Sequence, residues 1–127
     1  MKGIVKFGFI AAALSALIMS GCYSSDYNAV GFVHSNTSHE AYMDFYKFDG
    51  RIVFDLDADD GEVSYSGELE SGEITVSYDA DGEKTELFSL KAGEQINDTL
   101  TLPKGSSVYI IVETESPCEN GELNFNT

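Results

Sequence analysis

The sequence predicts an all-β domain, an antiparallel β-sandwich of the jelly-roll or Ig-like kind with about seven to nine strands. Three observations support this fold class. Several short segments alternate apolar and polar residues with the period of two that a half-buried strand requires. Turn-forming residue pairs separate these segments. The segments also recur at roughly eight- to twelve-residue spacing, which is typical of sandwiches and small barrels.

Three segments in the middle of the chain show the alternation most clearly. Each places its apolar side chains on one face of the predicted strand. They are residues 51–56 with Ile52, Phe54 and Leu56, residues 63–69 with Val63, Tyr65 and Leu69, and residues 73–78 with Ile74, Val76 and Tyr78. Gly67 interrupts the second segment and predicts a bulge or kink.

Two later segments have different patterns. Residues 107–112 are apolar on both faces, which predicts a strand in the interior of a sheet. Leu123 and Phe125 predict a final strand that pairs inside the sheet rather than at its edge.

Residues 39–48 allow two interpretations. Ser38 could cap a helix that carries Ala41, Phe45 and Phe48 on one side. The segment is also dense in aromatic residues, which favour strands. We expect a strand.

The turn pairs divide the segments consistently. Asp-Gly occurs at residues 49–50, 60–61 and 81–82, and it is a strong signal for a hairpin because glycine accepts positive φ. Ser71-Gly72 and Lys104-Gly105 predict two further turns.

The first 21 residues have the layout of an export signal. Lys2 and Lys6 precede an apolar stretch, residues 7–19, that only Gly8 and Ser15 interrupt. As a helix this stretch would be about 20 Å long, well short of the roughly 30 Å hydrocarbon core. A secretory signal is therefore expected rather than a membrane span.

The end of this signal, Leu17-Ile18-Met19-Ser20-Gly21-Cys22, resembles the lipobox of bacterial lipoproteins, although Met19 stands where leucine is commonest. The resemblance implies cleavage after Gly21 and a diacylglyceryl group on Cys22. The alternative is an ordinary signal peptide that ends beside a cysteine. Two acyl chains hold a protein durably. We therefore expect attachment to the cell membrane or outer membrane, facing outside the cytoplasm.

The expected organisation follows from this. Residues 1–21 would be the signal peptide, residues 22–28 the lipidated cysteine with a short polar tether, and residues 29–127 a single β-sandwich domain. Cleavage would leave five basic and twenty-two acidic side chains, a net charge of −17. That charge excludes nucleic acid as a partner and disfavours contact of the folded surface with anionic lipid. Cys118 would be the one remaining thiol, either buried or free.

An acidic stretch at residues 55–62 contains weak candidate calcium ligands, Asp55, Asp57, Asp59 and Asp60, because calcium prefers carboxylate oxygens. An EF-hand is excluded, since Asp60 occupies the position of its glycine and Ser66 the position of its glutamate. We expect a solvated acidic turn.

His34 and His39 could approach each other across a turn, but a zinc site needs three or four ligands. We therefore expect two surface histidines and no cofactor.

The sequence contains no nucleophile or phosphate-binding motif that would indicate catalysis. The expected function is therefore a non-catalytic binding or structural module of the cell envelope, with a protein or glycan as its partner. The alternative is a small carbohydrate-active or other hydrolytic enzyme. Five tyrosines could form a sugar-stacking platform if several share an exposed face, although core packing is the more common role: Tyr42, Tyr46, Tyr65, Tyr78 and Tyr109.

Overall fold

The computed structural model describes residues 23–127, so the predicted signal peptide and Cys22 lie outside the described residues. The described chain forms nine strands: β1 (Asp26–Val30), β2 (Val33–Asn36), β3 (Glu40–Ala58), β4 (Glu62–Ser71), β5 (Glu73–Asp79), β6 (Thr85–Lys91), β7 (Gln95–Thr101), β8 (Ser106–Glu113) and β9 (Cys118–Asn126). Across these residues there is no helix with the length and hydropathy needed to cross a bilayer.

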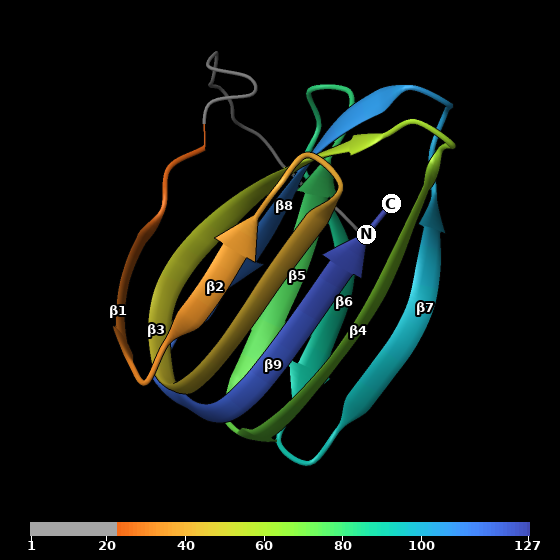
Figure 1. Ribbon diagram of the computed structural model, residues 1–127. Coiled ribbons are helices and arrows are strands. Elements are labelled where there is room, and N and C mark those ends of the chain that lie inside the picture. The colour runs from red at the N-terminus through yellow and green to blue at the C-terminus, as the bar shows by residue number, and fades with distance from the viewer. Residues whose placement is uncertain (1–22) are drawn as a thin grey trace, which may run out of the picture.

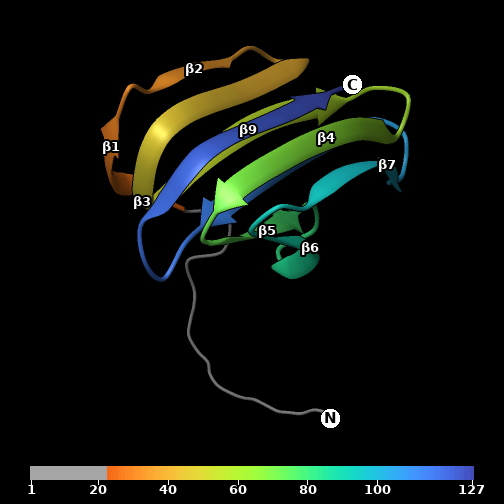
Figure 2. The ribbon, with the colours of Figure 1, turned by 90° about the horizontal axis from the view of Figure 1, so that it is seen from below.

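The long strand β3 belongs to both layers of the sandwich (Figures 1 and 2). Its first half, residues 40–48, pairs with β9, and its second half, residues 51–58, pairs with β8. On the opposite edge β2 and β1 pair with it one after the other. The chain bends at Gly50, whose φ of 128° is open to glycine and strained for other residues.

The strand order is that of a jelly roll. We call β2-β3-β9-β4-β7 the β9 layer and β1-β3-β8-β5-β6 the β8 layer. After the bend in β3, β4 lies in the β9 layer, and β5 and β6 lie in the β8 layer. The chain then returns to the β9 layer with β7, crosses to the β8 layer with β8 and ends in the β9 layer with β9. Without β2 and β1 at the edges, each layer has four strands, β3-β9-β4-β7 and β3-β8-β5-β6, and two four-stranded layers connected in this way define the jelly roll. The predicted β-sandwich is confirmed, and the jelly roll is the topology it adopts.

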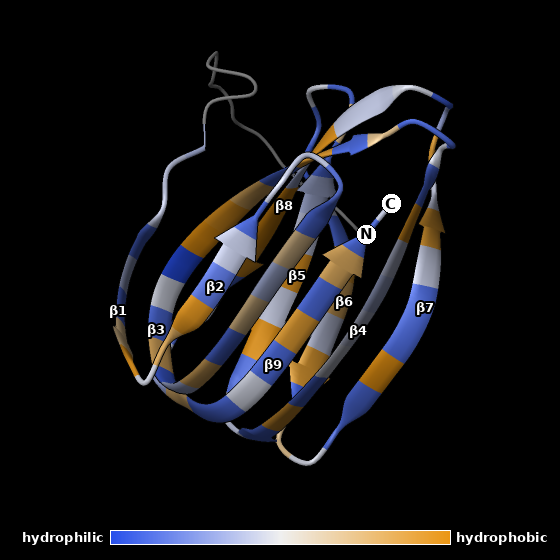
Figure 3. Ribbon diagram, in the orientation of Figure 1, coloured by the Kyte–Doolittle hydropathy of each residue, from blue (hydrophilic) through white to orange (hydrophobic). Residues whose placement is uncertain are grey.

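The inner faces of the two layers form one apolar core. Along β3, β4 and β9 buried apolar residues alternate with mostly polar ones (Figure 3). The largest fully buried side chains of this core come from both halves of β3 and from five other strands: Phe45, Phe48, Phe54, Phe125, Met43, Leu56, Ile74, Leu90, Ile110, Leu123 and Val63. Tyr65 and Phe88 stack with their ring centroids 5.2 Å apart, which joins β4 to β6.

Most strand predictions are confirmed. Residues 40–58 form a strand and not a helix. β8 lies between β3 and β5, as its two apolar faces predict, and β9 lies between β3 and β4. The turn pairs at Gly61, Gly72, Gly82 and Gly105 all connect successive strands.

Three local predictions are wrong. Asp49-Gly50 is no hairpin but the bend inside β3, where β1 approaches so closely that a Cβ on Gly50 would overlap the Asp26 carbonyl. The pairing of β4 runs through Gly67 without a register shift, because this glycine instead makes room for Leu123. Residues 23–28 were expected to form a tether, yet β1 already begins at Asp26.

The free edge of the second half of β3 is capped by groups outside the ladder. The amide N–H of Val53 donates to Ser25 Oγ at 2.9 Å. Asp55 is held twice by Asn36, because its N–H donates to Oδ1 at 2.9 Å and its carbonyl accepts from Nδ2 at 3.0 Å. The N–H of Asp57 donates to the Ser38 carbonyl at 2.6 Å. These bonds satisfy an edge that would otherwise be open to pairing with another chain.

Candidate functional site

The outer face of the β9 layer carries two straight rows of polar side chains. Register pairing places Tyr42, Asn124, Ser66 and Asn97 side by side across β3, β9, β4 and β7. These four residues alternate with core residues along their strands, so their side chains point away from the core. The row therefore combines two amides and two hydroxyls, each of which can both donate and accept hydrogen bonds.

The second row is acidic. It consists of Asp44, Glu122, Glu68 and Gln95, which are neighbours in the same register. Like charges directly opposite each other destabilise a sheet. Gln95 Nε2 donates to Glu68 Oε1 at 3.5 Å and partly offsets this repulsion.

Tyr42 connects the two rows. Its hydroxyl lies 3.1 Å from Asp44 Oδ2 and 3.1 Å from Glu122 Oε2. The hydroxyl has one proton, so it donates to one of these carboxylates at a time. Burial raises the pKa of Tyr42 to about 12, and the hydrogen bonds to the two carboxylates act in the same direction.

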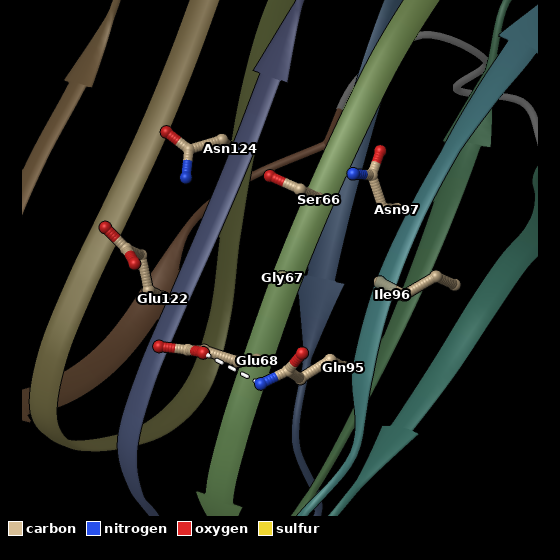
Figure 4. A pocket seen from close by; sticks show the side chains of 8 residues that line it. All are labelled: Ser66, Gly67, Glu68, Gln95, Ile96, Asn97, Glu122 and Asn124. Atoms are coloured by element: carbon tan, nitrogen blue, oxygen red, sulfur yellow. Dashed lines mark hydrogen bonds between the residues drawn. The ribbon is translucent and has the colours of Figure 1, made fainter.

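The residues of these rows on β9, β4 and β7 line an open groove. A hollow of about 430 Å³ lies over β9, β4 and β7, lined by Ser66, Gly67, Glu68, Gln95, Ile96, Asn97, Glu122 and Asn124 (Figure 4). A second hollow of about 360 Å³ shares Glu68 and Gln95 with the first and continues to Glu70, Glu94 and Asn120. Together they form one elongated groove, which suits an extended ligand better than a small compact one.

The chemistry of this groove differs from that of a usual small-molecule pocket. Such pockets are mainly apolar with a few polar groups, whereas this lining is almost wholly amide, hydroxyl and carboxylate. The lining contains no lysine or arginine, so the groove disfavours anionic ligands. A glycosidase general acid lies in an apolar, water-poor setting, but Glu68 is exposed and Glu122 only half-buried.

The predicted calcium candidates do not converge. Asp55 and Asp57 border a hollow of about 300 Å³ with Asn36. Asp59 points elsewhere, since its Oδ2 lies 3.0 Å from His39 Nε2 in an exposed pair. Throughout residues 23–127 no three histidine, cysteine or acidic side chains come together closely enough to hold a metal ion.

The two histidines have separate surroundings. His34 stacks on Phe32, with ring centroids 4.7 Å apart, while His39 contacts Asp59. Cys118 is buried against Gly72, and burial raises the pKa of its thiol.

The five tyrosines do not form a shared platform. Tyr65 is buried and Tyr78 packs against the core. Tyr109 contacts Tyr23 with ring centroids 5.6 Å apart. Tyr42 borders the groove, and Tyr46 is exposed on the same strand.

Sequence reasoning missed the groove. Its residues appear in the sequence as the polar positions of alternating strands, which are also found on any solvated sheet face. Only the register between β9, β4 and β7, strands distant in the chain, brings Asn124, Ser66 and Asn97 together.

No protein-family model matches the chain, and no curated protein matches it. Among solved structures, the EutQ protein of Clostridium difficile is 16% identical with a TM-score of 0.38, over 86% of this chain and 75% of its own. A family 29 carbohydrate-binding module is 10% identical with a TM-score of 0.38, over 83% and 84%. The cupin domain of Drosophila melanogaster CENP-C is 16% identical with a TM-score of 0.36, over 92% and 86%. Similarity of this extent carries no argument about function.

Proposed function

We propose that the protein is a lipid-anchored module of the bacterial cell envelope that binds a glycan chain, without catalysis, in the groove of the β9 layer. The observation that carries the binding proposal is the pair of polar rows across β9, β4 and β7. Amides can donate to and accept from the hydroxyls of a sugar, and carboxylates can accept from them.

The charge of the groove narrows the ligand class. Glu122 and Glu68 line the groove, Asp44 lies beside Glu122 in the register, and the lining contains no cation. A glycan rich in carboxylate or sulfate groups would be repelled, whereas a neutral or amine-bearing glycan would not. The elongated shape favours an oligosaccharide over a monosaccharide.

The anchoring part of the proposal rests on the lipobox-like sequence that ends at Cys22. Substituting Cys22→Ser should release the protein from the membrane fraction or leave it as uncut precursor. A Cys22→Ser protein that matures normally and still partitions into detergent would show that no lipid on this residue anchors the chain.

Binding is tested with the purified mature protein against neutral, amine-bearing and acidic oligosaccharides. We expect measurable affinity for members of the first two classes. The double variant Asn97→Ala with Asn124→Ala should weaken binding about tenfold or more through its lost hydrogen bonds. Asn28→Ala, at an exposed position on β1, is the matched control. Preference for acidic glycans, or equal binding by all three proteins, would refute the groove as the site.

A further inference from the structure

The outer face of the β8 layer contains residues that are buried although they point away from the core. Ile111, Ser77 and Asp79 are 0%, 4% and 3% exposed. Ser77 pairs with Ile111 across β5 and β8, and Asp79 pairs with Tyr109. Alternation along β5 and β8 directs all of them outward, opposite to core residues such as Val76.

Tyr23 lies against this face and satisfies its buried carboxylate. The Tyr23 hydroxyl donates to Asp79 Oδ2 at 2.5 Å. The other oxygen, Oδ1, accepts the amide N–H groups of Asp81 at 3.2 Å and Gly82 at 2.7 Å. The Tyr23 ring packs edge-on against Tyr109. Burial is the larger cause that raises the pKa of the Tyr23 phenol, and its hydrogen bond to Asp79 raises this pKa further.

The next two residues are also attached to the domain. The Ser24 carbonyl accepts from Arg51 Nε at 2.9 Å, and Ser25 Oγ accepts from the Val53 amide. β1 then begins at Asp26. Every residue from Tyr23 onward is therefore attached to the domain, and no free linker separates the domain from Cys22. Consecutive Cα atoms are about 3.8 Å apart, so Cys22 must lie close to Tyr23.

We propose that Tyr23 is a latch that holds the lipid attachment point against the outer face of the β8 layer, so that the groove of the β9 layer faces away from the membrane. This inference rests on the lipidation of Cys22 in the proposed function. The two outer faces lie on opposite sides of the sandwich (Figure 2). The latch side also carries the cations Arg51 and Lys84, both bound to Glu113, whereas the groove lining has none.

The latch is tested on full-length lipidated protein in liposomes that contain a headgroup-labelled acceptor lipid. A donor dye is placed either at Ser107→Cys, exposed on the outer face of β8, or at Thr99→Cys, exposed on β7 in the β9 layer. Cys118 is fully buried and does not compete for the dye. We expect stronger energy transfer from residue 107 than from residue 99.

Tyr23→Ala should reduce this difference markedly, and Tyr23→Phe, which keeps the ring but loses the bond to Asp79, should reduce it in part. Tyr46→Ala, an exposed tyrosine on β3, is the matched control and should preserve it. Equal transfer from both positions in the unsubstituted protein, or a difference unchanged in Tyr23→Ala, would overturn the latch. Protein that carries dye on Cys22 and stays in solution would instead overturn the lipid anchor itself, and the latch with it.

Discussion

Replacing Asn36 by alanine should destabilise the domain more than replacing the exposed Asn28, because the Asn36 side chain satisfies both backbone groups of Asp55 on the free edge of β3. The substitution removes the bonds to the N–H and carbonyl of Asp55, at 2.9 Å and 3.0 Å. It also removes the bond from Nδ2 to the Thr37 carbonyl at 2.9 Å. A hydrogen bond contributes about 0.5–1.5 kcal/mol net, so the two bonds to Asp55 together contribute about 1–3 kcal/mol.

For a domain of this size the loss corresponds to a fall in Tm on the order of 10 °C. The assay is thermal and urea unfolding followed by circular dichroism. Asn28→Ala, which changes the same side chain on β1, should stay within about 0.5 kcal/mol of the unsubstituted protein. Asn36→Ala should also raise the tendency to aggregate, since it opens an edge strand. Equal stability of the two variants would refute the edge-closing role.

Three further predictions concern titration, metal binding and the bend. Because the folded pKa of Tyr42 is raised to about 12, its contribution to stability should be complete below pH 10 and lost as the pH rises towards 12. Calcium should raise Tm no more than magnesium at equal ionic strength, and Asp57→Asn with Asp59→Asn should be nearly neutral. Gly82→Ala should cost roughly 1–2 kcal/mol for its positive φ alone. Gly50→Ala should cost a further 1–3 kcal/mol, because its Cβ also meets the backbone of β1.

Each of these three predictions can be measured directly. Absorbance titration of the phenols should lose one late step in Tyr42→Phe, and an unchanged curve would contradict the raised pKa. A rise in Tm of several degrees that is specific to calcium and abolished by the double aspartate substitution would establish a metal site at residues 55–60. Similar unfolding free energies for Gly50→Ala and Gly82→Ala would show that β1 does not press against the bend.

Local patterns were enough to predict the strands and their faces. Ile52, Phe54 and Leu56 occur at every second position, and a strand that alternates in this way has only one face to bury. The two apolar faces of residues 107–112 likewise predicted an interior strand, which β8 is.

Non-local contacts decided the features that sequence reasoning missed. Asp49-Gly50 and Asp60-Gly61 have the same turn signal, but only the second ends a strand. At Gly50 the strand bends but does not end, because β1 pairs along it on both sides of the glycine. The contact between Tyr23 and Asp79 spans 56 residues, and no periodicity along the chain indicates it.

The central claim, that the jelly roll is anchored by a lipid immediately before Tyr23, is tested most directly by the mass of the first tryptic peptide from the membrane fraction. That peptide should run from Cys22 to Lys47, since no lysine or arginine lies between them. Its mass should equal that of the peptide plus a diacylglyceryl group, with or without a further acyl chain. A first peptide that begins at another residue, or that carries Cys22 as a free thiol, would contradict the account.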